Sequence, residues 1–281
     1  MTDKAPRPAA PGNLLDSLLS PQRTAVMGIL NLTPDSFSDG GDFVDPQVAI
    51  AHAARMVAEG ADIIDVGAES TRPYGGMKPV TADDECRRLA PVLPALLALG
   101  KPVSIDSMKA EVADWALGQG VAMANDVWGL HRDPDMAHVV AAHGVPLIVM
   151  HNRDAADPAI DIMADIVTFF ERSLAIADKA GIRRDRIVLD PGIGFGKTPE
   201  QSIIAVARLR DLRRFELPIL VGLSRKRFIA SIVPSEPKQR LGGSIAGHLI
   251  AAMQGAGIVR AHDVAETVQA LRVAEAIRDA G

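Results

Sequence analysis

The 281-residue chain has one cysteine, one tyrosine and few aromatic residues of any kind, which make up 4% of it. The single cysteine, Cys86, excludes an internal disulfide framework and a metal site built from several thiolates, and it is compatible with a reducing cytosol. No segment approaches the roughly 18 unbroken apolar residues of a membrane-spanning helix. The net charge of −5 excludes a generally basic surface that coats nucleic acid. We therefore expect a soluble, cytoplasmic protein.

The chain is long enough to form one substantial core, and 48% of its residues are apolar. The opening MTDKAPRPAAPGN lacks the apolar core of a signal peptide, so we expect residues 1–22 to form a flexible N-terminal arm. No linker or low-complexity tract interrupts the rest. Residues 23–281 are therefore expected to form a single domain.

Short apolar runs alternate with longer amphipathic stretches along this domain. Several runs are rich in Val and Ile and nearly continuous in apolar character, which is typical of parallel strands buried on both faces. The expected strands are 26–33, 62–68, 102–107, 122–128, 146–151, 187–192, 218–224 and 258–264. Eight strands, each followed by a helical segment, predict an α/β protein of the (β/α)8 TIM barrel class, with a doubly wound open sheet as the alternative.

Helix boundaries are marked by turn chemistry. Asp45-Pro46 and Thr198-Pro199 each indicate an N-cap followed by proline in the first turn. Glycine follows each helical stretch, where it takes the left-handed conformation without a Cβ penalty. The stretches are 45–60, 81–100, 107–120, 134–144, 164–181 and 244–257, each ending in its glycine.

Polar side chains stand at the expected carboxyl ends of the strands, which is where a barrel carries its functional residues. Asp106, Asn125 and Asp190 end three strands, and Lys226 follows a fourth. Carboxylates accept from ring N–H groups, an amide both donates and accepts, and lysine donates to a ring carbonyl or nitrogen. The set therefore predicts a site for a flat, polar heterocycle.

An aspartate after a strand is most often a helix cap. That interpretation fits Asp126 and Asp263, because each neighbours another candidate and so points the other way in an alternating strand. It fits Asp106 and Asp190 less well, since both directly follow apolar strand residues and burial without a partner is costly.

Basic residues gather after the last two strands. Arg225-Lys226-Arg227 follows one, and Arg260 and His262 lie on the next. Barrels often bind phosphate there, and the helix expected after Gly242-Gly243-Ser244 can add backbone N–H donors. The alternative for the first cluster is a solvated helix start.

Two further segments have unusual composition. The run from Gly192 to Thr198 resembles a nucleotide-binding loop, but Pro191 breaks the Walker A spacing and Lys197 breaks the dinucleotide fingerprint. The opening MGILNLTPDSFSDGG runs from a strand into a polar tract with Phe37 at its centre, which favours a lid over the barrel mouth.

Taken together, these motifs resemble dihydropteroate synthase. The resemblance runs from about residue 26 to the C-terminus and rests on segments 31–41, 69–73, 104–107, 125–126, 150–151, 190–197, 224–226 and 260–263. It implies a homodimeric barrel enzyme of folate biosynthesis that joins 4-aminobenzoate to 6-hydroxymethyl-7,8-dihydropterin diphosphate and releases pyrophosphate. It departs from many relatives at Asn152-Arg153.

The resemblance also implies roles for individual residues. Asp106, Asn125, Asp190 and Lys226 are the expected pterin-binding set, Arg260 with His262 the diphosphate anchor, and Asn31 the Mg²⁺ contact. Among them, Asp106, Lys226 and Arg260 are the expected catalytic residues. Substrate-covering loops and the amine pocket are implied at Thr33, Pro34, Phe37, Thr71, Arg72, Ser224 and Arg225. No insertion lies between Ser224 and Ile229, which favours sensitivity to sulfonamides.

Three other functions fit parts of the pattern. A pterin-dependent methyltransferase shares the barrel and the ring-binding set, but needs neither the Asn31–Gly41 lid nor the Arg260–His262 anchor. An aldolase-type lyase would use Lys226 as a Schiff-base lysine. A non-catalytic protein would bind the pterin diphosphate without consuming it.

Overall fold

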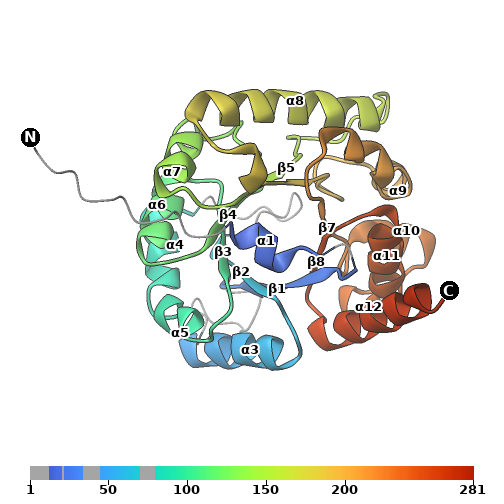
Figure 1. Ribbon diagram of the computed structural model, residues 1–281, viewed down its shortest axis with the longest axis horizontal. Coiled ribbons are helices and arrows are strands. Elements are labelled where there is room, and N and C mark those ends of the chain that lie inside the picture. Colours follow the sequence, from blue (N-terminus) through green and yellow to red (C-terminus); the bar gives the residue numbers. More distant parts are fainter. Residues whose placement is uncertain (1–12, 21, 34–44, 70–79) are drawn as a thin grey trace, which may run out of the picture.

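The computed structural model describes residues 13–20, 22–33, 45–69 and 80–281. Parallel strands form a ring with helices around it (Figure 1). The strands are β1 Ala25–Asn31, β2 Ile63–Gly67, β3 Val103–Asp106, β4 Met123–Asp126, β5 Leu147–Met150, β6 Ile187–Asp190, β7 Leu220–Gly222 and β8 Ile258–Ala261. Their order is β6-β5-β4-β3-β2-β1-β8-β7, and a parallel bridge between Leu189 and Ile219 links β6 to β7. The predicted (β/α)8 barrel is confirmed.

Helices follow the strands in alternation. They are α1 Leu14–Leu18, α3 Pro46–Ala58, α4 Ala82–Leu89, α5 Leu93–Leu97, α6 Ala110–Gly118, α7 Met136–His143, α8 Ile162–Ala180, α9 Pro199–Ala207, α10 Arg227–Ile232, α11 Leu241–Gln254 and α12 Val264–Asp279. Short 3₁₀ turns occupy Arg184–Arg186, Leu209–Phe215 and Pro237–Gln239. Asp45 accepts from the Gln47 N–H, and Thr198 forms a capping box with Gln201, so both predicted N-caps are confirmed.

Two predicted helices have different boundaries in the structure. Segment 81–100 is split into α4 and α5, because Pro91 and Pro94 cannot donate the backbone hydrogen bonds of a continuous helix. Helix α11 begins at Leu241 and not after Ser244, and its C-cap is Gly255, with φ of 103°. Gly257 was the expected cap, but its N–H donates to the Ile219 carbonyl at the start of the strand pairing.

The barrel interior has two kinds of lining. Towards the amino ends of the strands it is apolar, with Ala25, Met27, Ile63, Met123, Ile148, Val188, Leu220 and Ile258 in one cluster. Two residues further along several strands, where the side chain again points inward, stand Asp65, Asn125, Asp190 and Arg260. The polar site therefore lies at the carboxyl end of a barrel whose other end is filled with apolar side chains.

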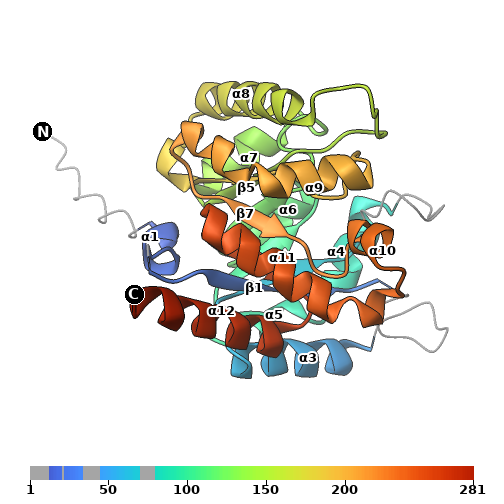
Figure 2. The same cartoon turned by 90° about the vertical axis from the view of Figure 1, so that its right-hand side faces the viewer.

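Helix α1 closes the apolar end. It lies across the middle of the ring in Figure 1, and Figure 2 shows it at the opposite end of the molecule from α10. Leu15 is 2% exposed and packs into the apolar interior cluster. The prediction of a flexible arm through residue 22 is therefore wrong for Leu14–Leu18, because Leu15 has an apolar cluster to bury against.

A second, larger core lies between the strands and the surrounding helices. Phe170, Met56 and Leu89, for example, are fully buried there against the outward faces of the strands. Among the described residues, no helix is long and apolar enough to cross a membrane.

Candidate active site

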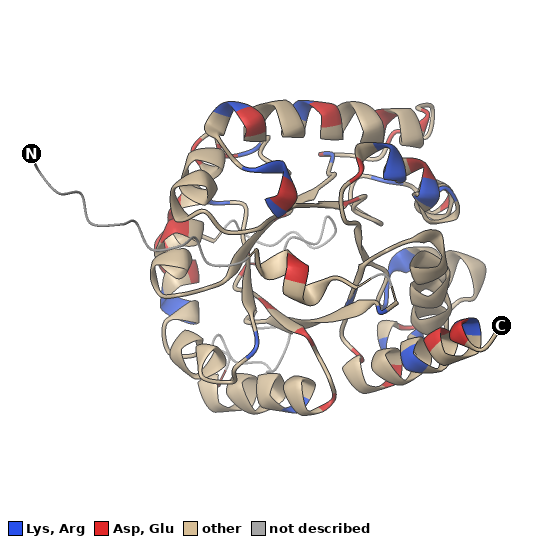
Figure 3. Ribbon diagram, viewed as in Figure 1, with Lys and Arg blue, Asp and Glu red and all other residues tan. Residues whose placement is uncertain are grey.

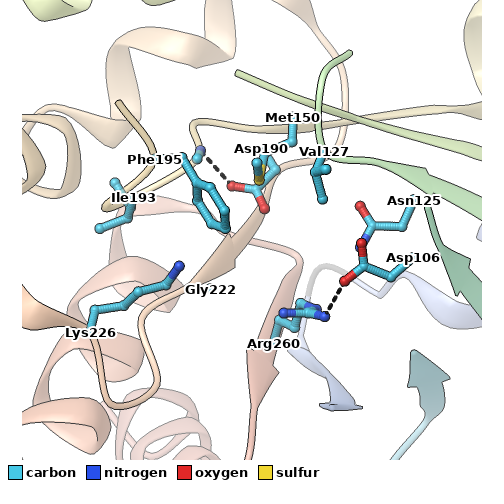
Figure 4. A pocket seen from close by; sticks show the side chains of 11 residues that line it. Asp106, Asn125, Val127, Met150, Asp190, Ile193, Phe195, Gly222, Lys226 and Arg260 are labelled. Atoms are coloured by element: carbon cyan, nitrogen blue, oxygen red, sulfur yellow. Dashed lines mark hydrogen bonds and ion pairs between the residues drawn. The ribbon is translucent and has the colours of Figure 1, made fainter. Parts of the chain in front are cut away.

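A pocket at the carboxyl end of the barrel contains most of the polar residues expected from the strand ends. It is lined by Asp106, Asn125, Val127, Met150, Asp190, Gly192, Ile193, Phe195, Gly222, Lys226 and Arg260 (Figure 4). The predicted heterocycle set and Arg260 thus lie together, contributed by β3, β4, β6 and β8 and the loop after β7.

Arg260 organises one side of the pocket. Its Nε donates to Asp65 Oδ2 at 2.6 Å and its Nη2 to Asp106 Oδ2 at 2.7 Å. The Asn125 amide also donates to Asp65 Oδ2, at 3.1 Å. These contacts orient Asp106 and Asn125 side by side, as the pairing of β3 with β4 in register requires.

Two acceptor atoms in the pocket lining are buried without a hydrogen-bond partner among the described residues. They are Asp106 Oδ1 and Asn125 Oδ1. A buried acceptor left unpaired costs about 1–3 kcal/mol. An atom in this position, at the surface of a pocket, is therefore available to accept from a ligand N–H.

The opposite side of the pocket is formed by Asp190 and the loop that follows β6. Asp190 Oδ1 accepts from the Gly192 N–H at 2.8 Å. Lys226 Nζ lies 4.0 Å from the centre of the Phe195 ring, which is a cation–π distance. Figure 4 shows the Asp190 and Asp106 carboxylates on two sides of the same space, with Lys226 and Arg260 below them.

Burial changes the protonation of both carboxyl groups. It raises the pKa of Asp106 to about 7, with the Arg260 charge opposing the shift and Asp65 adding to it. Burial also raises the pKa of Asp190 to about 6, while the hydrogen bond from Gly192 and the charge of Lys226 oppose it. Aspartates that titrate near neutrality are typical of functional sites.

The residues after β7 and β8 form a neighbouring cluster. Ser224 Oγ accepts from the His262 N–H at 3.2 Å and lies 2.9 Å from its Nδ1. Arg225, with φ of 58°, makes an ion pair with Asp263, and its N–H donates to Ser244 Oγ at 2.9 Å. The structure thus brings Ser224 and His262 together.

The aspartates expected as helix caps have other contacts. Asp126 is 2% exposed and accepts from the N–H groups of Trp128 and Leu130, so it caps a turn. Asp263 occupies the N-cap position of α12, but its side chain makes no capping hydrogen bond and pairs with Arg225. The prediction of a helix cap is wrong for both side chains, because a turn and a nearby guanidinium supply the partners.

Some predicted site residues cannot be placed against this pocket. Pro34, Phe37, Thr71 and Arg72 lie outside the described residues. Thr33 is buried just beyond β1, and Asn31 is partly buried at the carboxyl end of that strand.

The residues present are consistent with Mg²⁺ that is carried by a substrate. Among the described residues, no group of three or more His, Cys, Asp or Glu side chains is arranged to hold a metal ion. Asn31 offers one neutral amide oxygen. Because Mg²⁺ usually keeps several waters and binds substrate phosphates, a single amide contact fits an ion that arrives with a diphosphate.

Three residues of the site were missed from the sequence. Asp65 lies within the apolar strand β2, where a buried carboxylate is itself a signal of a partner. Phe195 was attributed only to a glycine-rich loop. In the sequence Lys197 stands out only because it breaks the dinucleotide fingerprint. In the structure it is 2% exposed and donates to carbonyls of the glycine-rich loop.

Comparison with known proteins shows the family of this chain. The model of the family described as pterin binding enzyme matches residues 27–262. A dihydropteroate synthase from Clostridium beijerinckii is 44% identical over 258 residues, which cover 91% of this chain and 95% of the relative. The chain belongs to the dihydropteroate synthase family.

Solved structures of that family share the fold at high identity. A dihydropteroate synthase from Clostridium difficile, crystallised in the presence of pteroic acid, is 50% identical and has a TM-score of 0.87. The comparison covers 91% of this chain and 97% of that one. The Xanthomonas albilineans family member has been solved with 4-aminobenzoic acid (43% identity, TM-score 0.86) and with 7,8-dihydropteroate (41%, TM-score 0.83). Both comparisons cover 91% of this chain; they cover 93% of the chain solved with 4-aminobenzoic acid and 94% of the chain solved with 7,8-dihydropteroate.

Proposed function

We propose that this chain is a transferase of folate biosynthesis with dihydropteroate synthase activity. It condenses 6-hydroxymethyl-7,8-dihydropterin diphosphate with 4-aminobenzoate to give 7,8-dihydropteroate and pyrophosphate. The observation that carries the proposal is the convergence of Asp106, Asn125, Asp190, Lys226 and Arg260 on one pocket in a member of this family. The family members solved with pteroic acid, 4-aminobenzoic acid and 7,8-dihydropteroate support the choice of substrates.

The pterin ring fits the polar groups of the pocket. A pterin presents N–H and NH₂ donors along one edge, and Asp106 Oδ1 and Asn125 Oδ1 are buried acceptors without a partner in the described chain. Asp190 accepts from a second position, and the Lys226 ammonium donates to the ring carbonyl or a ring nitrogen. Val127, Met150 and Ile193 supply the apolar surface that the faces of a flat ring need.

The chemical step creates charge of both signs. When the C–O bond to the diphosphate breaks, the exocyclic methylene carbon becomes cationic and the ring nitrogens delocalise that charge. The amino nitrogen of 4-aminobenzoate then forms the new C–N bond and loses a proton. Ionised Asp106 and Asp190 beside the ring stabilise the developing cation more than the neutral ground state, which lowers the barrier.

Cations near the last two strands hold the departing diphosphate in this proposal. Arg260 lies on β8, and His262 lies just after the strand, two residues further along the chain. Mg²⁺, contacted by Asn31, would neutralise part of the diphosphate charge. Arg260 also pairs with Asp106, so one guanidinium would contact both a ring-binding carboxylate and the anion.

The amine pocket and the covering loops belong to the same proposal. Ser224 and Arg225 are assigned to the 4-aminobenzoate side together with Thr33, Pro34 and Phe37. Thr71 and Arg72 are assigned to a second covering loop. By covering the pocket, the loops would exclude water, which otherwise captures the methylene cation.

Sensitivity to sulfonamides, a homodimeric state and a cytoplasmic location complete the proposal. A Yersinia pestis dihydropteroate synthase that is 41% identical, with a TM-score of 0.86, has been solved as a sulfonamide drug complex. The comparison covers 94% of this chain and 97% of that one. Cys86 is a free thiol, which suits a reducing compartment.

Pyrophosphate release tests the function directly. With Mg²⁺, dihydropterin diphosphate and 4-aminobenzoate together, we expect continuous release of pyrophosphate, and none when either organic substrate is omitted. Replacement of Asp106 by Ala should lower kcat/KM at least about 100-fold, since a buried charged partner of the ring is lost. Circular dichroism of that variant should match the wild type.

Each contrary outcome has a defined meaning. Pterin binding without release would identify a non-catalytic binder, and borohydride trapping of Lys226 with a carbonyl substrate would identify a lyase. Near-normal turnover of Asp106→Ala would refute the role of that carboxylate.

A further inference from the structure

Lys197 is a buried lysine behind the pocket wall, and the proposed mechanism does not use it. Its side chain is 2% exposed. The Nζ atom lies 2.6 Å from His151 Nδ1, 2.9 Å from the Gly192 carbonyl oxygen and 3.1 Å from the Phe195 carbonyl oxygen. An ammonium group has three N–H donors. These acceptors match those donors one for one.

The histidine in this set has a defined tautomer. His151 Nε2 lies 2.9 Å from Asp165 Oδ2. Hydrogen bonds from His151 and Arg153 lower the pKa of Asp165 to about 2, so the carboxylate is ionised and only accepts. His151 Nε2 therefore carries the proton, and Nδ1 turns its lone pair to Lys197. Asp165, on α8, thus holds Lys197 through His151.

The two carbonyls that Lys197 binds belong to a tightly turned loop. Gly192 and Gly196 have φ of 61° and 53°. A Cβ atom on Gly192 would lie 1.9 Å from the His151 carbonyl oxygen, and one on Gly196 would lie 2.4 Å from Arg153 Cβ. Only glycine permits this path, and glycine does not by itself hold it, because it is the most flexible residue. The loop needs an external tether.

That loop makes two of the contacts that shape the pocket. The Gly192 N–H donates to Asp190 Oδ1 at 2.8 Å, and the Phe195 ring lies against Lys226 Nζ at 4.0 Å. Both contacts involve residues assigned above to pterin binding. The carbonyls bound by Lys197 belong to the same two loop residues, Gly192 and Phe195, so a shift of either moves a pocket contact directly.

We propose that Lys197 is a positioning residue for pterin binding, which fixes the 192–196 loop so that Asp190 and Lys226 face the ring. The proposal rests on the proposed function for the identity of the ligand. Lys197 is not itself among the residues that line the pocket. It acts through the carbonyls of Gly192 and Phe195, with His151 and Asp165 as its support.

The energetic cost of this arrangement argues for a purpose beyond stability. Burial lowers the pKa of Lys197 to about 7, and the nearby Asp190 charge opposes that shift. Lys226, Asp165 and Arg153 are the other charged groups that act on it. Because an apolar side chain of similar volume is often as stabilising as a buried charge, stability alone does not require a lysine here.

Steady-state kinetics and direct binding test the proposal. In Lys197→Met, whose unbranched apolar side chain is one atom shorter and has no donors, we expect KM for dihydropterin diphosphate to rise about tenfold. KM for 4-aminobenzoate should stay within about twofold, because its proposed contacts lie elsewhere. Calorimetric titration with 6-hydroxymethylpterin should show the same loss of affinity.

A matched pair on α8 separates positioning from stability. Asp161 and Asp165 both lie at the start of that helix, and Asp161 caps it through the Met163 and Ala164 N–H groups. Asp165→Ala releases His151 and should raise the pterin KM about threefold. Asp161→Ala should lower the melting temperature and leave the pterin KM unchanged. The pair therefore compares loss of the support for His151 with loss of a helix cap on the same helix.

The outcomes are distinct. A Lys197→Met protein with a lower melting temperature but an unchanged pterin KM and Kd would overturn the proposal. If that variant does not fold, equal pterin KM values for Asp165→Ala and Asp161→Ala would overturn it instead. Absence of pyrophosphate release by the wild type would refute the proposed function alone, since the Kd comparison with 6-hydroxymethylpterin still tests Lys197.

Discussion

Asp65 places two pocket side chains with one oxygen atom. Its Oδ2 accepts from Arg260 Nε and from Asn125 Nδ2, and it is fully buried in the middle of β2. Without this carboxylate, Arg260 would keep a single ion pair among the described residues, the one with Asp106, and its direction would be less well fixed. A residue that never needs to touch substrate thereby determines where a cation and an amide point.

Replacing Asp65 by Asn should therefore damage catalysis more than folding. The amide retains one acceptor but removes the charge that faces Arg260, and we expect kcat/KM to fall about 10–100-fold. Pyrophosphate release measures the loss, and thermal unfolding serves as the control. A kcat/KM within twofold of the wild type would show that Arg260 is positioned by Asp106 alone.

The two buried carboxyl groups also predict an acid limb in the pH profile. Because the pKa is raised to about 7 for Asp106 and to about 6 for Asp190, both groups take up protons as the pH falls through this window. A protonated carboxyl loses an acceptor for ring N–H groups and its charge beside the cation. The apparent pKa values belong to the coupled pair.

We therefore expect kcat/KM for dihydropterin diphosphate to fall between pH 7 and pH 6, where ordinary aspartates are still ionised. Initial rates from pH 9 to 5, with circular dichroism at each pH, provide the measurement. In Asp106→Asn only the Asp190 limb should remain, at lower pH. A wild-type profile that is flat down to pH 5 would contradict the ionised-carboxylate mechanism.

The polar residues at the strand ends and Arg260 within β8 could be predicted, whereas Asp65 within β2 could not. Asp106, Asn125 and Asp190 follow from alternation and from the rule that barrel sites lie at the carboxyl ends of strands. The pairing of Asp65 with Arg260 joins residues 195 positions apart, which no local pattern indicates. Lys197 was equally hidden, since its partners His151 and the 192–196 loop meet only in the closed barrel.

At the scale of elements, α1 shows how a short helix can stabilise a barrel from outside the repeat. Its five residues lie before the first strand, and Leu15 inserts into the apolar amino-terminal end of the ring. The proline-rich opening of the sequence gives little indication of this helix, because five residues are too few to show a clear hydrophobic periodicity. The helix is stabilised by burial and by its Asn13 cap, not by its length.

The contribution of α1 can be measured with one substitution. Leu15→Ala should lower the free energy of unfolding by about 2–3 kcal/mol, the lower part of the range for a buried leucine, since the site lies at the barrel end. Denaturant unfolding at constant protein concentration gives the value. Ser17→Ala on the exposed face of the same helix should change it by less than about 0.5 kcal/mol. Equal effects would show that α1 adds nothing to the closed barrel.

At the scale of the whole molecule, helix α11 and its neighbour α12 expose apolar side chains to water. Helix α11 contains no Asp, Glu, Lys or Arg, and it is tan throughout in Figure 3. Two of its apolar side chains are exposed, Ile250 at 48% and Met253 at 75%. The neighbouring α12 exposes Val273 at 54% and Ile277 at 70%. Exposed apolar groups on adjacent helices are typical of a subunit interface.

This face supports the homodimer that we propose. A two-fold contact needs a self-complementary patch of about 800 Å² on each subunit, and two neighbouring helices of 14 and 16 residues are long enough to supply it. Sedimentation or light scattering should therefore give twice the mass of the 29.7 kDa chain. Charges placed in the patch by Met253→Glu with Ile277→Glu should shift the mass to that of the monomer at micromolar concentration.

A control separates loss of the interface from a general effect of added charge. Val48 on α3 is 45% exposed and lies outside the α11–α12 face, so Val48→Glu should leave the mass of the dimer unchanged. Since none of the described residues that line the pocket lies on α11 or α12, the monomeric double variant should still bind 6-hydroxymethylpterin with wild-type affinity. A double variant that remains dimeric would place the contact on another face. One that loses pterin affinity together with the dimer would show that the partner subunit stabilises the pocket, most directly through β8, which lies between α11 and α12 along the chain and carries Arg260.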